Sequence, residues 1–89
     1  MSHKVLVIED ERMMLKVIEF RLQKDGYEVR IAEDGKEGIK LIESWEPEII
    51  ITDIMMPYVS GLEIISHVRN TLKKQTPILV LSAVGLEKT

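Results

Sequence analysis

Two kinds of hydrophobic pattern follow one another along the chain. Residues 5–8 and 49–51 are continuous apolar runs rich in β-branched side chains, which is typical of strands buried on both faces of a parallel sheet. Residues 27–32 alternate between apolar and polar side chains, and this pattern predicts a half-exposed strand near a sheet edge. Pro77 opens a further apolar run over residues 78–81, which we expect to form the fourth strand.

Helical spacing of apolar residues fills the segments between these strands. The three predicted helices cover about residues 11–24, 36–45 and 61–74. Gly26 and Pro47 end the first two, and Ser60 with Glu63 forms a capping-box pattern before the third. From the first and third helices, the side chains expected to face the core are Met14, Leu15, Ile18 and Leu22, and Leu62, Ile65, Val68 and Leu72.

The predicted order of elements is therefore strand and helix in strict alternation, with four strands and three helices. Such alternation favours an α/β fold, in which right-handed crossovers place helices on both faces of a parallel sheet. Ligands of open parallel sheets bind beyond the carboxyl ends of the strands, so the residues at those ends are the candidates for chemistry.

Acidic residues follow two of the predicted strands. Glu9 and Asp10 come directly after the first strand, and Asp53 closes the third, predicted over residues 48–53. Because these two strands are expected to be neighbours, about 4.8 Å apart, Asp10 and Asp53 should meet at one sheet edge. Clustered carboxylates repel one another unless a cation neutralises them, and an all-oxygen site suits Mg²⁺. A carboxylate in such a site can also become an aspartyl phosphate, and a phosphoryl oxygen would be within reach of the Ser82 hydroxyl at the end of the fourth strand.

Composition narrows the functional classes. The chain has 89 residues, enough for one small domain, and a net charge of −3 without a block of basic residues, so we expect no direct binding of nucleic acid. It contains no cysteine, which excludes disulfides, cysteine-based zinc sites and thiol catalysis. Its N-terminus does not resemble a signal peptide, and no uncharged stretch is long enough to insert into a membrane. We therefore expect a cytoplasmic protein.

A set of motifs extends along the chain from the first strand end to the last. In chain order the residues are Glu9-Asp10, Asp34-Gly35, Pro47, Asp53-Ile54-Met55-Met56-Pro57, Gly61, Pro77 and Ser82-Ala83. This set, at this spacing, resembles the receiver domain of bacterial two-component response regulators, and the resemblance covers the whole chain. That family has a flavodoxin-like, doubly wound parallel sheet with strand order 2-1-3-4-5.

The resemblance implies a role for each matching residue. Asp53 would be the phosphoacceptor. Mg²⁺ would be held by Glu9, Asp10, Asp53 and the backbone carbonyl of Met55, with Asp10 as the more direct ligand of the first pair. Ser82 would be the hydroxyl that moves toward the phosphoryl group. The partner would be a sensor histidine kinase or a phosphotransfer protein, and the chain would be a switch rather than an enzyme.

Two features depart from the family pattern. Glu9 stands where many members have aspartate, so its longer side chain could reach the metal through water. The chain stops just after the predicted fourth strand, so residues 1–89 are expected to be a C-terminally truncated receiver domain without an output domain. The family's lysine of the fifth strand has no counterpart, because Lys88 falls where a fourth helix would begin.

These departures leave alternatives open. The fourth strand would become a sheet edge, and edges of this kind pair with other chains. We therefore expect a homo-oligomer formed through this strand or through the uncovered face of the sheet. An alternative function is that of a truncated or engineered receiver fragment that folds or self-associates but cannot be phosphorylated or signal. A phosphatase with an aspartate nucleophile is disfavoured because the run from Glu9 to Arg12 lacks the pattern Asp-x-Asp-x-Thr. His3 and His67 are expected to be solvated surface residues.

Overall fold

The computed structural model describes residues 2–81. Its strands form one parallel sheet in the order β2-β1-β3-β4. The elements in chain order are β1 (Lys4–Ile8), α1 (Arg12–Lys24), β2 (Glu28–Ala32), α2 (Gly35–Trp45), β3 (Ile49–Asp53), α3 (Gly61–Ser66), the π-helical turn η1 (His67–Thr71) and β4 (Ile78–Leu81). This is the α/β arrangement with a parallel sheet that the alternating pattern predicted, and its strand order agrees with the flavodoxin-like fold that the resemblance implied. The doubly apolar strands β1 and β3 are neighbours in the centre.

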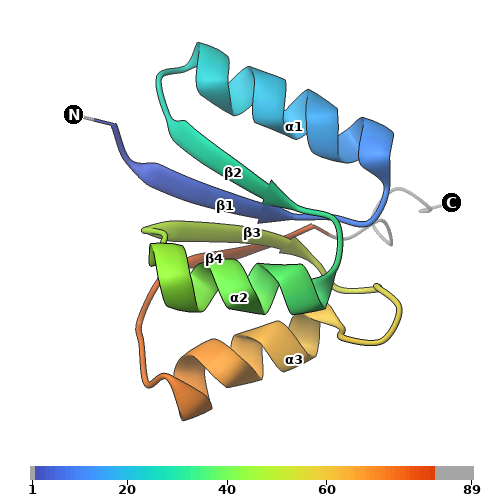
Figure 1. The fold of residues 1–89 in the computed structure, drawn as a ribbon, viewed down its shortest axis with the longest axis vertical. Coiled ribbons are helices and arrows are strands. Elements are labelled where there is room, and N and C mark those ends of the chain that lie inside the picture. The colour runs from blue at the N-terminus through green and yellow to red at the C-terminus, as the bar shows by residue number, and fades with distance from the viewer. Residues whose placement is uncertain (1, 82–89) are drawn as a thin grey trace, which may run out of the picture.

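Helices cover both faces of the sheet. Figure 1 shows α1 alone on one face and α2 with α3 on the other. Alternate residues of β1 divide between the two layers: Val5 and Val7 pack with Leu15 of α1, whereas Leu6 and Ile8 belong to the core on the other face. This division confirms that the run at residues 5–8 is apolar because the strand is buried on both sides.

The third helix differs from its prediction. It is α-helical only over Gly61–Ser66 and continues as the wider turn η1 to Thr71. Its buried side chains are Ile64 and Val68, whereas Leu62 is 62% exposed. The predicted inward face was therefore wrong at Leu62. The start of the helix is fixed by its cap and by the close packing of Gly61 on the end of β3, and this sets its rotation.

Two other side chains also differ from their predictions. Met14, expected to face the core, is 46% exposed on α1. The His67 ring, expected to be solvated, lies partly buried with Nε2 2.7 Å from Oε2 of Glu43 on α2. That contact joins α2 to the turn after α3, so His67 belongs to the packing between two helices.

Side-chain caps begin α2 and α3 at the edge where the strands end. The Glu37 backbone N–H donates to Asp34 Oδ1 at 2.8 Å. At α3, the Glu63 N–H donates to the Ser60 hydroxyl and the Ser60 N–H donates to Glu63 Oε1 at 2.8 Å, which confirms the capping box. The helix starts and the carboxyl ends of the strands thus share one rim of the molecule (Figure 1).

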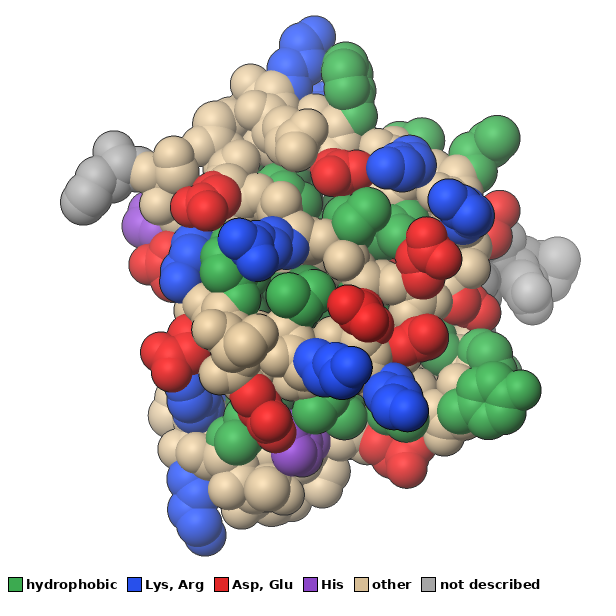
Figure 2. Space-filling model, viewed as in Figure 1, with side chains coloured by type: hydrophobic (Ala, Val, Ile, Leu, Met, Phe, Trp, Pro, Cys, Tyr) green, Lys and Arg blue, Asp and Glu red, His purple; other side chains and the backbone are tan. Residues whose placement is uncertain are grey.

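The surface carries charges of both signs. On the face shown in Figure 2, Lys and Arg side chains are intermingled with Asp and Glu side chains. No helix in the part of the chain that the structure describes is long and apolar enough to cross a membrane.

Candidate functional site

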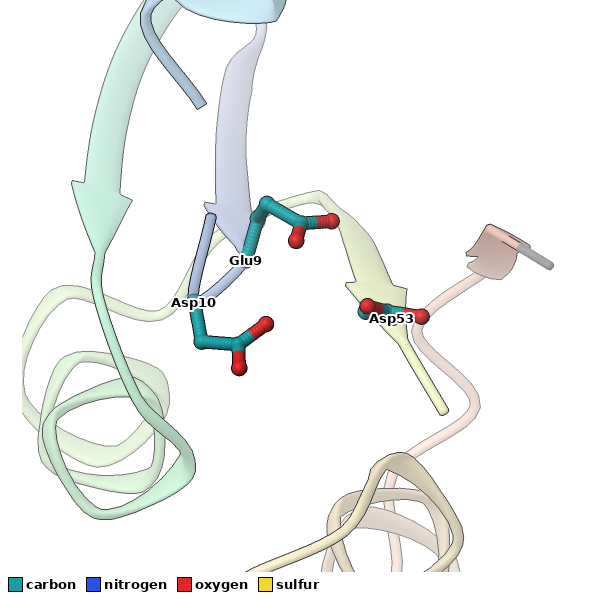
Figure 3. Close-up of side chains that lie close together, drawn as sticks. All are labelled: Glu9, Asp10 and Asp53. Atoms are coloured by element: carbon teal, nitrogen blue, oxygen red, sulfur yellow. The ribbon is translucent and has the colours of Figure 1, made fainter. Parts of the chain in front are cut away.

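Three carboxylates converge at the carboxyl ends of the two central strands. Ile8 of β1 lies opposite Thr52 of β3 in the parallel register, so the residues that follow each of them emerge side by side. Figure 3 shows the side chains of Glu9, Asp10 and Asp53 at this rim. One oxygen from each carboxylate lies within 4.8 Å of the others.

Glu9 is the buried member of this cluster. It is 5% exposed, whereas Asp10 is exposed and Asp53 is intermediate. The Glu9 backbone N–H donates to the Ala32 carbonyl of β2 at 3.1 Å, and its Oε2 accepts the Glu11 N–H at 3.0 Å. The backbone and the side-chain carboxylate of Glu9 are therefore both held by hydrogen bonds to backbone groups of other residues.

The electrostatics of the cluster favour a cation. Burial raises the pKa of Glu9, and the neighbouring charges of Asp53 and Asp10 raise it further, although the hydrogen bond from the Glu11 N–H opposes them. Ionisation of a carboxyl group in this environment costs extra free energy, and a bound cation offsets that cost. Three carboxylates in an all-oxygen set are suitable ligands for Mg²⁺.

The loop after β3 is folded tightly against the start of α3. A Cβ on Gly61 would collide with the Asp53 carbonyl oxygen and would lie 2.8 Å from Ile54 Cα. The Gly61 N–H donates to the Ile54 carbonyl at 2.9 Å. In this loop the Met56 side chain is buried in the core, whereas the Met55 side chain is 79% exposed. If Met55 contributes to the site, its backbone carbonyl is the group that does so.

Comparisons with known proteins identify the family to which this fold belongs. The family model described as the response regulator receiver domain matches residues 5–89. The chain belongs to the response regulator receiver domain family. Receiver domains of this family act as phosphoacceptors in two-component signalling, with histidine kinases or phosphotransfer proteins as their partners.

Solved receiver domains have the same fold. The receiver domain of the Francisella response regulator 1452 is 33% identical, with a TM-score of 0.87, and the match covers 99% of this chain and 70% of that one. Chemotaxis protein CheY4 of Vibrio cholerae is 34% identical, with a TM-score of 0.84 over 90% of this chain and 68% of its own. Response regulator TrrA of Thermotoga maritima, solved in complex with Mg²⁺ and BeF, is 37% identical, with a TM-score of 0.85 over 91% of this chain and 70% of its own.

The receiver fold brings together most of the residues selected from the sequence. Glu9, Asp10 and Asp53 share one cluster, whereas Ser82 and its neighbour Ala83 lie outside the described residues. The sequence argument missed Thr52, a fully buried polar residue directly before Asp53. The available signal was a hydroxyl in a strand whose other inward-facing residues are isoleucines.

Proposed function

We propose that this receiver domain accepts a phosphoryl group on Asp53 from a phosphohistidine of a sensor histidine kinase or a phosphotransfer protein. The observation that carries the proposal is the convergence of Glu9, Asp10 and Asp53, whose oxygens lie within 4.8 Å of one another at the carboxyl rim of the sheet. Asp53 is the only one of the three that comes from β3, and it is partly exposed, so a donor is able to reach it.

The donor set fits Mg²⁺, which we propose as the cofactor. The groups that would hold it are Glu9, Asp10, Asp53 and the Met55 backbone carbonyl, all of them oxygen donors. The Mg²⁺ complex of the 37% identical TrrA receiver supports this choice. When bound, the ion supplies positive charge that offsets the negative charge of the phosphoryl oxygens.

In the proposed reaction, a carboxylate oxygen of Asp53 attacks the phosphorus in line with the leaving nitrogen. The P–O bond forms as the P–N bond of the phosphohistidine breaks, and the imidazole nitrogen keeps the electron pair. The resulting acyl phosphate is later hydrolysed, when water attacks phosphorus and the Asp53 carboxylate leaves with inorganic phosphate as the other product. Ser82 is proposed to donate a hydrogen bond to a phosphoryl oxygen.

The test is the intact mass of the chain after incubation with a small acyl phosphate, with and without Mg²⁺. We expect a Mg²⁺-dependent gain of one phosphoryl group, and we expect this gain to be lost in Asp53→Asn because the amide is not a nucleophile. Asp25→Asn is the matched control, since Asp25 is an exposed acid at the end of α1, paired with Arg21, and should leave the gain unchanged.

Two results would contradict the proposal. One is a phosphoryl group that Asp53→Asn still accepts. The other is the absence of any gain in a chain shown by circular dichroism to be folded. The second result would favour the alternative function, a receiver fragment that folds or self-associates without being phosphorylated.

A further inference from the structure

Thr52 places a polar group where the strand would otherwise be apolar. Its side chain is 0% exposed, and its partners across the sheet are Ile8 of β1 and Val80 of β4. Valine has nearly the same shape and an equally good strand propensity. Because a buried hydroxyl loses its hydration, it needs a hydrogen bond to be tolerated at such a position.

The partner of this hydroxyl is the next residue. Thr52 Oγ1 donates to the Asp53 backbone carbonyl at 3.0 Å. Gly61 is packed against the same carbonyl so closely that a side chain there would collide with the oxygen. The peptide unit between Asp53 and Ile54 is therefore held by the hydroxyl and by the start of α3.

The following peptide unit is also held. The Ile54 carbonyl accepts the N–H of Gly61 at 2.9 Å and the N–H of Met56 at 3.2 Å. Two consecutive carbonyls at the end of β3 thus have fixed directions. They determine where the Asp53 side chain starts and how the chain turns toward Met55.

We propose that Thr52 is a positioning residue whose hydroxyl sets the peptide unit after Asp53, and thereby aligns the Asp53 carboxylate with the Met55 carbonyl. This inference rests on the proposed function of Asp53 as the phosphoacceptor. The hydroxyl touches neither the phosphoryl group nor the metal. It acts by limiting the angles that the reacting carboxylate samples, and small misplacements of a reacting group slow a reaction strongly.

The experiment compares Thr52→Val, which removes the hydroxyl and keeps the shape, with Thr52→Ser, which keeps the hydroxyl. Ile51→Val is the control for a small change of packing, because Ile51 is the preceding residue of β3 and faces the other core cluster. Each protein is assayed for the rate of Mg²⁺-dependent phosphorylation by a small acyl phosphate. The ¹³C NMR signal of the Asp53 carbonyl, which is sensitive to hydrogen bonding, and the midpoint of urea unfolding are measured alongside.

We expect Thr52→Val to be phosphorylated about threefold to tenfold more slowly, as the loss of one hydrogen bond implies. Its Asp53 carbonyl signal should move upfield, while its unfolding midpoint stays close to that of the parent. Thr52→Ser should restore both the rate and the carbonyl signal. Ile51→Val should match the parent in rate, whatever its effect on stability.

Phosphorylation of Thr52→Val at the parent rate would overturn the inference, and so would a Thr52→Ser variant as slow as Thr52→Val. If the folded parent gains no phosphoryl group, the proposed function fails by itself. The carbonyl signal and a Mg²⁺ titration followed by NMR then decide about Thr52. An unchanged Asp53 carbonyl in Thr52→Val would overturn its positioning role, whereas an upfield shift with weaker Mg²⁺ binding would support it.

Discussion

At the scale of single residues, we expect the burial of Glu9 to make the stability of the fold depend on pH and on Mg²⁺. The pKa of Glu9 is raised from its ordinary value of 4.5, first by burial and then by the charges of Asp53 and Asp10. The folded state therefore binds the proton of Glu9 more tightly than the unfolded state does. It follows that Glu9 makes its most favourable contribution below about pH 4.5, and that this contribution is lost as the pH rises through the raised pKa.

Replacing Glu9 by glutamine should remove this pH dependence. In EDTA, we expect Glu9→Gln to be more stable than the parent at neutral pH, because no buried charge is formed. The advantage should shrink as the pH falls through the raised pKa of Glu9, and it should be gone below about pH 4.5, where Glu9 is protonated in both states. The measurement is the free energy of unfolding from urea titrations between about pH 4 and pH 7.

The difference between the two proteins is the quantity to examine. The pKa of Glu48 is lowered, chiefly by the hydrogen bond from the Lys4 backbone N–H, so its contribution is lost as the pH falls. This opposite trend occurs in both proteins and cancels in the difference. Addition of Mg²⁺ at neutral pH should stabilise the parent more than Glu9→Gln. A constant difference across the pH range would contradict the interpretation.

At the scale of elements, α3 is short and depends on its cap. Its α-helical part has only 6 residues, too few to be stable through its own backbone hydrogen bonds. The reciprocal bonds between Ser60 and Glu63 satisfy two of the free N–H groups at its start. The cap also fixes the place where the loop from Asp53 joins the helix, so it serves both stability and the site.

Removal of this cap should lower the free energy of unfolding by more than a typical surface substitution does. We expect Ser60→Ala to lower the free energy of unfolding by about 1 kcal/mol. Ser44→Ala is the matched control, because the Ser44 hydroxyl donates only to the Lys40 carbonyl within α2 and alanine is the better helix former there. Urea unfolding of both variants provides the measurement. If the two substitutions changed the free energy of unfolding equally, the capping box would not stabilise the protein beyond an ordinary surface hydroxyl.

Most elements were predictable from the sequence, because each has a strong local signal. The apolar runs of β1 and β3 and the capping box at Ser60 are all local patterns, and the structure confirms each of them. The inward face of α3 was not predictable from helical spacing, because contact between Gly61 and the end of β3 sets the rotation of this helix. That contact depends on how the loop between β3 and α3 folds back, so helical spacing within α3 does not predict it.

At the scale of the whole molecule, the two edge strands differ in character. The β2 edge carries the exposed charged residues Glu28 and Arg30, which discourage pairing with another chain. In the described residues, β4 is the opposite edge, and its Leu79 and Val80 are 59% and 40% exposed. We propose that copies of this chain associate through β4 or through the apolar surface beside it.

Sedimentation velocity over a range of protein concentrations tests this proposal. We expect the parent to sediment above the monomer mass and Leu79→Lys to shift toward the monomer, since a charge on an edge strand opposes pairing. Tyr27→Lys, beside the β2 edge, is the matched control and should leave the distribution unchanged. A compact monomer that unfolds cooperatively at every concentration would rule out association through β4.

The carboxylate cluster of the candidate site was predictable from the sequence because the neighbouring positions of β1 and β3 were predictable. Once β1 and β3 are recognised as neighbours, Glu9, Asp10 and Asp53 must share one rim. The sequence could not indicate how the Asp53 carbonyl is held, because the roles of Thr52 and Gly61 follow from a turn geometry that only the folded chain shows. The different burial of Met55 and Met56 depends on the same turn.

The central position of β1 in the sheet affects how the nascent chain folds during synthesis. β1 is synthesised before both of its neighbours, yet it lies in the interior of the sheet and pairs with β2 on one side and with β3 on the other. Ribosomes add about 5–20 residues per second, so the Val5–Ile8 segment leaves the exit tunnel seconds before Ile49–Thr52 can join it. During that interval the side of β1 that pairs with β3 is an unpaired apolar edge, and we expect chaperones to hold this segment until β3 emerges.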